Sequence, residues 1–102
     1  MYCLSARQLL FSDLPDAEAS KWLPKMQCQP AEGWNNIITY GGWKDVPSIY
    51  LIAEDDEVLP PQLQRQFAAM AGSEAKTVKA GHMFMLSQPG KGLEVILRAA
   101  VA

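Results

Sequence analysis

The second half of the chain alternates between strand-like and helix-like hydrophobic patterns. Residues 46–53 form an almost continuous apolar run of branched and aromatic side chains, which is typical of a strand buried on both faces in a parallel sheet. Residues 61–71 have the spacing of an amphipathic helix, residues 76–80 predict a second, weaker strand, and the apolar stripe after Gly90 predicts a closing helix. The apolar faces expected on the two helices are Leu63, Phe67 and Met70, and Leu93, Ile96, Leu97 and Ala100.

The predicted order is therefore strand, helix, strand, helix. A strand–helix–strand unit of this size joins two parallel strands. Pro61 suits the first position of the first helix, and Gly72 suits its C-terminal cap. Two strands alone do not make a stable sheet, and the apolar first strand has the pattern of one with neighbours on both sides. We therefore expect an incomplete sheet.

The first 45 residues predict short helices interrupted by prolines. Residues 13–18 have the acidic side chains of a first helical turn, and Pro24 is expected to end that helix early. Its expected apolar face is Ala19, Trp22, Leu23 and Met26. Residues 27–44 have the composition of a loop, yet they carry three large aromatic side chains.

The composition limits the classes of protein that remain possible. A length of 102 residues fits one small domain, and 49% hydrophobic with 20% charged residues is typical of a chain that folds. A net charge of −2 without a basic run argues against nucleic acid or a membrane surface as a partner. No apolar stretch approaches the roughly 18–20 residues that cross a bilayer, and the start lacks a secretory signal, so a cytoplasmic location is expected. Cys3 and Cys28 match no metal or redox spacing and are expected to be reduced thiols.

Chemistry-bearing side chains follow both predicted strands. Residues 54–57 are four consecutive acids after the first strand, and His82, the only histidine, follows the second. The carboxyl ends of parallel strands meet at one edge of a sheet, so an acid and the histidine are expected to lie close together. A carboxylate that binds one imidazole nitrogen leaves the other free to act as a general base.

Each of these two features also has a purely structural interpretation. Four acids after a strand are often a solvated turn that places negative charge near the start of the next helix. A histidine between a glycine and an apolar stretch can be buried and bonded to the backbone. The two features together, in the order acid then histidine, favour catalysis.

Two stretches of the chain resemble the C-terminal part of an α/β-hydrolase. Residues 46–61 read VPSIYLIAEDDEVLPP and are followed by Gln64, and residues 80–89 read AGHMFMLSQP. They are most similar to the branch that holds plant methylesterases and hydroxynitrile lyases. The resemblance implies that residues 1–45 are a partial helical cap and that residues 46–102 are the last strand–helix units of the α/β core. Packing within a core or cap is expected for Trp22, Trp34 and Trp43 in preference to lining an acyl pocket.

The same resemblance implies roles for individual residues. Asp56 corresponds to the acid of a Ser-Asp-His triad and His82 to its base, with Asp55 as the rival for the acid, and Met83 is expected to border the pocket. The implied substrate is a small carboxylic ester or a related carbonyl compound; lyase chemistry on a cyanohydrin stays open. The implied reaction needs no metal and no organic cofactor.

The chain departs from that family at the nucleophile. No serine or cysteine lies in a Gly-x-Ser-x-Gly elbow, and the segments that form the oxyanion hole are not recognisable. Because triad members act as a unit, the chain alone is expected to be inactive. Two other readings stay open: a non-catalytic binding or interaction module, with self-association through exposed strand edges, and a truncated gene product without a selected function.

Overall fold

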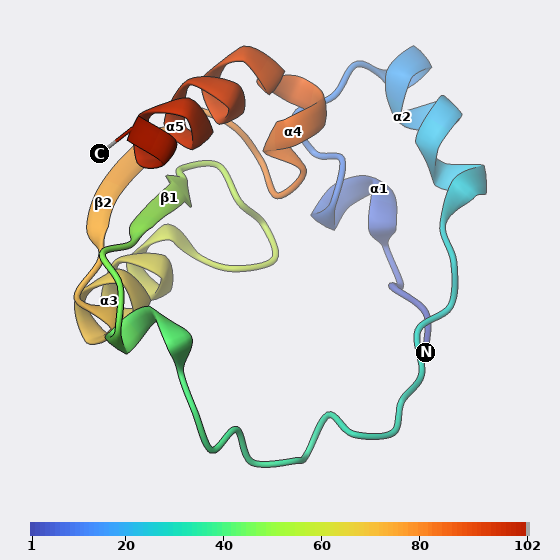
Figure 1. Ribbon diagram of the computed structural model, residues 1–102. Coiled ribbons are helices and arrows are strands. Elements are labelled where there is room, and N and C mark those ends of the chain that lie inside the picture. Colours follow the sequence, from blue (N-terminus) through green and yellow to red (C-terminus); the bar gives the residue numbers. More distant parts are fainter. Residues whose placement is uncertain (102) are drawn as a thin grey trace.

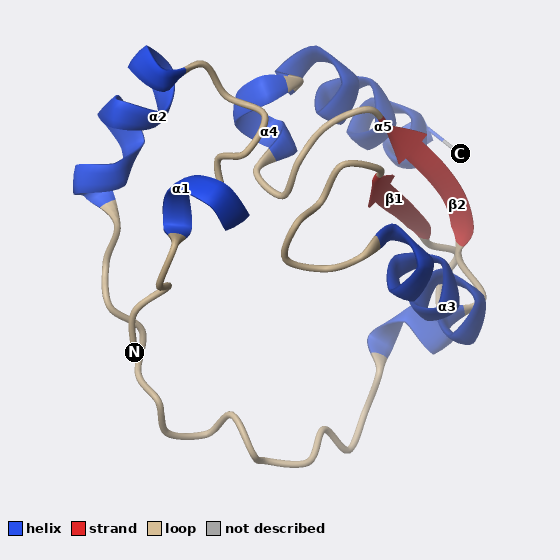
Figure 2. Cartoon of the chain, turned by 180° about the vertical axis from the view of Figure 1, so that it is seen from behind, coloured by secondary structure: helices blue, strands red, loops and turns tan. Residues whose placement is uncertain are grey.

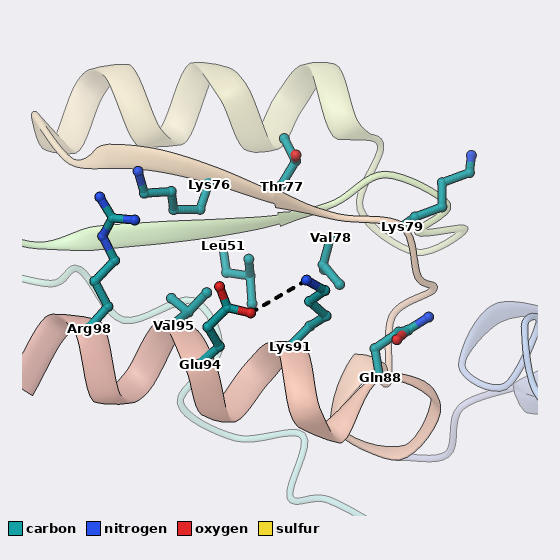
Figure 3. A pocket seen from close by; sticks show the side chains of 10 residues that line it. All are labelled: Leu51, Lys76, Thr77, Val78, Lys79, Gln88, Lys91, Glu94, Val95 and Arg98. Carbon is teal, nitrogen blue, oxygen red and sulfur yellow. Dashed lines mark hydrogen bonds and ion pairs between the residues drawn. The ribbon is translucent and has the colours of Figure 1, made fainter.

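The computed structural model describes residues 1–101. Its second half has the predicted order of strand β1 (Ile49–Ala53), helix α3 (Pro61–Ala71), strand β2 (Glu74–Val78) and helix α5 (Pro89–Val101), with a short helix α4 (Phe84–Ser87) before α5 (Figure 1). The two strands lie between α3 and α5, which cover opposite faces (Figure 3). The predicted strand–helix–strand–helix arrangement is confirmed.

The strands pair in parallel along their whole length. Ile49 lies opposite Glu74, and Ala53 lies opposite Val78. The second strand begins two residues earlier than predicted, because the backbone pairing already starts where the Glu74 amide donates to the Ser48 carbonyl at 2.9 Å. Both strands therefore end at the same level, and the loops that follow them leave the sheet side by side.

The prediction that the first strand is buried on both faces is only partly correct. Ile52 and Ala53 are buried, whereas residues 49–51 are half-buried. Within the described residues β2 is the only strand that pairs with β1, so the other edge of β1 stays open.

The ends of α3 are as predicted, but its apolar face is not. Pro61 begins the helix, and Gly72 ends it in the left-handed conformation (φ 67°). The side that packs on the strands carries Gln64 and Ala68, whereas Met70 is 83% exposed. The prediction was wrong because a polar side chain with backbone partners, described below, occupies the inner face.

The predicted apolar face of α5 is likewise exposed, including Leu93, Ile96 and Leu97. The helix approaches its neighbours through other residues. Gly92 is buried against the Phe84 ring, and a Cβ there would lie 3.0 Å from that ring.

Between α5 and the strands lies a cavity of about 340 Å³ (Figure 3). Its lining combines apolar Leu51, Val78 and Val95 with charged Lys76, Lys79, Lys91, Glu94 and Arg98.

The first part of the chain folds into short helices around a small core. Its helices are α1 (Ala6–Leu9), α2 (Asp16–Trp22) and a 3₁₀ turn, η1 (Leu23–Lys25), and Pro24 ends the helix early as predicted. The buried residues of this core are Phe11, Leu14 and Ala19, with Leu10, Trp22, Leu23, Met83 and Leu86 packed against them. Met83 immediately precedes α4 and Leu86 lies within it, so this core joins the two halves of the chain.

Residues 26–41 form a loop that arcs away from the helices (Figures 1 and 2) and leads to a second 3₁₀ turn, η2 (Gly42–Lys44). The N-terminal amine donates to the Gln29 carbonyl at 2.8 Å and holds the start of this loop. Trp34 is 65% exposed, and Trp43 is 47% exposed. Trp22 packs against the small core, in line with the expectation of core or cap packing. Trp34 is exposed in this loop, whereas Trp43, in η2, lines a cavity together with residues of β1 and α3.

Cys3 and Cys28 are both free and exposed, as expected. No helix within residues 1–101 combines the length and the apolar composition needed to cross a membrane.

Candidate active site

The loop after β1 turns one carboxylate inward. The backbone pairing continues past the strand ends, since the Glu54 amide donates to Val78 and the Asp55 amide donates to Ala80, both at 3.0 Å. The Asp56 side chain then points into the protein and is only 5% exposed. Its Oδ1 atom accepts hydrogen bonds from the amides of Val58 (2.8 Å) and Leu59 (3.0 Å). These two hydrogen bonds lie within the turn, so the turn itself orients the carboxylate.

The loop after β2 brings the histidine to this carboxylate. His82 Nδ1 lies 2.9 Å from Asp56 Oδ2 and 3.1 Å from Oδ1. The His82 side chain is about one-third exposed. Both of its hydrogen bonds to described residues use Nδ1, which leaves Nε2 without a partner among them.

A buried glutamine supports the carboxylate from α3. Gln64 is 3% exposed, and its amide pairs with the Ala53 backbone in both directions, accepting from the N–H at 2.9 Å and donating to the C=O at 3.1 Å. The same Nε2 also donates to the Leu59 carbonyl at 2.7 Å and lies 3.4 Å from Asp56 Oδ2. Gln64 therefore binds the end of β1 much as the peptide group of a neighbouring strand would.

The other acids of the cluster stay at the surface. Asp55 Oδ1 lies 2.8 Å from Lys79 Nζ, and this hydrogen bond raises the pKa of the lysine above its ordinary value. Glu54 lies 3.7 Å from Arg65, and Glu57 is exposed. The structure thus places Asp56, and not its neighbour Asp55, against the histidine.

A cavity of about 340 Å³ opens beside the pair. It is lined by Asp56, His82, Gln64, Leu59 and Phe84, and by β1 residues Ile49, Tyr50, Leu51 and Ala53. Met83, which was expected to border the pocket, is not among the residues that line this cavity; it packs against the N-terminal core.

Within the described chain, no serine or cysteine forms a hydrogen bond with His82. Ser48 and Ser73 bond to each other at the start of the strands, at the end away from the histidine. Residues 1–101 also hold no cluster of three His, Cys, Asp or Glu side chains that could bind a metal ion. The site is thus an acid–histidine pair beside an open cavity.

Such a pair has a defined chemistry. The ionised carboxylate accepts the Nδ1–H, which places the lone pair on Nε2 and stabilises the imidazolium once Nε2 takes a proton. Nε2 is the nitrogen that has no described partner. The arrangement can act as a general base and acid toward a molecule bound beside Nε2.

Gln64 is the residue of this site that the sequence patterns alone do not predict. A glutamine between Leu63 and Arg65 has the pattern of a solvated position, and only the resemblance to α/β-hydrolases includes it. A signal was present nonetheless: a long polar side chain one turn after Pro60 can reach back to the loop that precedes the helix.

Comparison with known proteins shows which sequences this chain resembles. The sequence model described as "Alpha/beta hydrolase family" matches residues 2–94. Over 96 residues the chain is 28% identical to a protein described as "Alpha/beta hydrolase nvfD" from Aspergillus novofumigatus. That match covers 92% of this chain and 38% of the relative, so the chain spans less than half of the relative's length.

Replacing the buried glutamine should destabilise the fold. Gln64→Leu leaves the Ala53 N–H and the Leu59 carbonyl without their partner, whereas the Ala53 carbonyl keeps the Asp56 amide at 3.4 Å. Each unsatisfied buried group costs about 1–3 kcal/mol, so we expect the free energy of unfolding, measured by urea denaturation, to fall by about 2–6 kcal/mol in total. Gln62→Leu, at an exposed position of the same helix, is the matched control and should change it by less than about 0.5 kcal/mol. Equal effects of the two variants would contradict this role.

Replacing the inward carboxylate should reverse the tautomer of the histidine. In Asp56→Asn the amide oxygen stays on the Val58 and Leu59 amides, so the NH₂ group faces His82 Nδ1 and donates to it. The ring proton must then move to Nε2. We expect ¹⁵N shifts of the single histidine, recorded at mildly alkaline pH, to show Nδ1–H in the parent chain and Nε2–H in the variant.

Asp55→Asn is the control for this measurement, since that side chain bonds to Lys79 at the surface and should leave the ring unchanged. An unaltered tautomer in Asp56→Asn would show that the pair does not form in solution.

Proposed function

The chain belongs to the α/β hydrolase family, and on that premise we propose that Asp56 and His82 are the acid and the base of a Ser-Asp-His triad that hydrolyses small carboxylic esters. The observation that carries the proposal is the 2.9 Å contact between a buried carboxylate and a histidine whose second nitrogen is unpartnered beside a cavity. Family membership supports the proposal, because catalysis by α/β hydrolases depends on an acid–histidine pair that activates a serine.

In the proposed reaction His82 Nε2 takes the proton of a serine hydroxyl as its oxygen attacks the ester carbonyl. The imidazolium then gives that proton to the leaving alkoxide, and the alcohol departs. A water molecule, deprotonated by the same nitrogen, releases the acid from the acyl-enzyme. Throughout, Asp56 keeps the ring oriented and balances its positive charge.

The proposed nucleophile is not one of the serines of this chain. These are Ser5, Ser12, Ser20, Ser48, Ser73 and Ser87. None of them hydrogen-bonds to His82 in the described part, so the chain by itself should lack the complete reaction. We further propose that residues 1–45 are part of a cap, because their small core packs against the loop that carries the histidine.

A second candidate is a non-catalytic interaction module. It is favoured by the open edge of β1 and by the exposed apolar side chains of α5, which are Leu93, Ile96, Leu97 and Val101. An exposed strand edge and an exposed apolar helix face are features that often bind another chain. An interaction module does not require His82 to react, so the reactivity of His82 distinguishes the two candidate functions.

The reactivity of His82 can be tested with p-nitrophenyl acetate on the 102-residue chain. Without a serine nucleophile the triad reaction is absent, but the unpartnered Nε2 can itself attack this activated ester: p-nitrophenolate leaves, and water then hydrolyses the acyl-imidazole. We expect His82→Ala to abolish this reaction and Asp56→Asn to slow it by about tenfold or more, because the Nε2–H tautomer has no lone pair for attack.

Asp55→Asn is again the control and should react within about twofold of the parent chain. A fluorophosphonate probe should label no serine. Equal rates for the parent chain and His82→Ala would overturn the proposed base and favour the interaction module. Labelling that depends on His82 would instead show that a serine of this chain is the nucleophile.

A further inference from the structure

The two residues that flank His82 in the sequence are both held by the N-terminal segment. The amide of Gly81 donates to Asp13 Oδ2 at 2.7 Å, a contact between residues 68 positions apart. On the other side Met83 packs against the core that contains Phe11 and Leu14. The histidine ring is therefore held by Asp56 at its tip, and the backbone on both sides of it is held by residues of the segment between α1 and α2.

The contact with Asp13 is unusually close. Its second oxygen, Oδ1, is buried and has no hydrogen-bond partner within residues 1–101. A Cβ at Gly81 would lie 2.8 Å from that oxygen and 2.9 Å from Ser12 Oγ. A side chain at this position would push the Asp13 carboxylate or the Ser12 hydroxyl aside, so glycine lets the loop lie this close to Asp13.

The remaining support of the loop comes from the acid side. The Ala80 carbonyl accepts the Asp55 amide at 3.0 Å, and the Gly81 amide, the next donor along the chain, is the one that Asp13 binds. With these two contacts the backbone just before His82 is fixed both to the acid loop and to the N-terminal segment.

We propose that Asp13 is a positioning residue for the catalytic histidine: through the Gly81 amide it holds His82 in reach of Asp56. The importance of Asp13 for catalysis rests on the proposed function, whereas its hydrogen bond to Gly81 does not. The carboxylate acts through an accepted hydrogen bond, so an amide oxygen at the same place should serve as well. The role extends the site from the two strand-end loops to the first part of the chain, to which the sequence analysis assigned no chemistry.

The test compares Asp13→Ala, which removes the acceptor, with Asp13→Asn, which keeps it. Two readouts are recorded on folded protein: the His82-dependent rate with p-nitrophenyl acetate, and the ¹⁵N shifts of the His82 ring. We expect Asp13→Ala to slow the reaction by about tenfold and to replace the Nδ1–H tautomer by a mixture, because a small displacement of a reacting group lowers rates steeply. We expect Asp13→Asn to match the parent chain in both readouts.

Asp45→Ala is the matched control, because Asp45 is exposed and makes no side-chain hydrogen bond to described residues. Gly81→Ala approaches the same contact from the other side and should resemble Asp13→Ala. If Asp13→Ala fails to fold, the comparison of Asp13→Asn with Gly81→Ala decides.

The proposal is overturned if Asp13→Ala, or Gly81→Ala in its place, is folded and keeps the parent rate and tautomer. It is also overturned if Asp13→Asn is folded but loses the tautomer. The ring readout keeps this outcome separate from a failure of the proposed function: a parent chain without His82-dependent reaction refutes the triad, while its tautomer still reports whether Asp13 positions the ring.

Discussion

The Asp56 carboxylate is 5% exposed, and a charge so far from water is tolerated only where hydrogen-bond donors surround it. Four donors meet this need: the amides of Val58 and Leu59, the side chain of Gln64 and the ring of His82. They come from the loop after β1, from helix α3 and from the loop after β2. The need to satisfy one carboxylate thus determines how three elements of the chain meet.

The parallel pairing of β1 and β2 makes this meeting possible. Because the strands run in the same direction and end in register, the loops that follow them start at the same edge of the sheet. Helix α3, which connects the two strands in the sequence, can therefore place a side chain next to the end of β1 and the loop that follows it. Gln64 uses this position to bind the end of β1 and the acid loop together. The sheet and the site are therefore stabilised by the same contacts, and the two-stranded sheet flanked by helices is consistent with an incomplete α/β hydrolase fold.

The sequence predicted the topology well and the packing poorly. The order of elements, the caps of α3 and the approach of an acid to His82 follow from local patterns and from the geometry of parallel sheets. The choice of Asp56 over Asp55 depends on which carboxylate the turn points inward; local patterns left both open, and only the family resemblance favoured Asp56. The exposed faces of α3 and α5 were misjudged, because apolar spacing identifies a face without showing what covers it. The contact of Asp13 with Gly81 joins residues 68 positions apart, a separation at which a single sequence holds no pattern.

The central claim is that Asp56 holds the imidazole in one tautomer and leaves Nε2 free, and His82, as the only histidine, makes this directly observable. The measurement is a ¹H–¹⁵N correlation spectrum of the ring in the unmodified chain at mildly alkaline pH. If Asp56 holds the ring, the spectrum shows a protonated Nδ1 with a downfield, slowly exchanging proton, and an unprotonated Nε2. A ring that averages both tautomers, as free imidazole does, or one that carries its proton on Nε2, would contradict this claim.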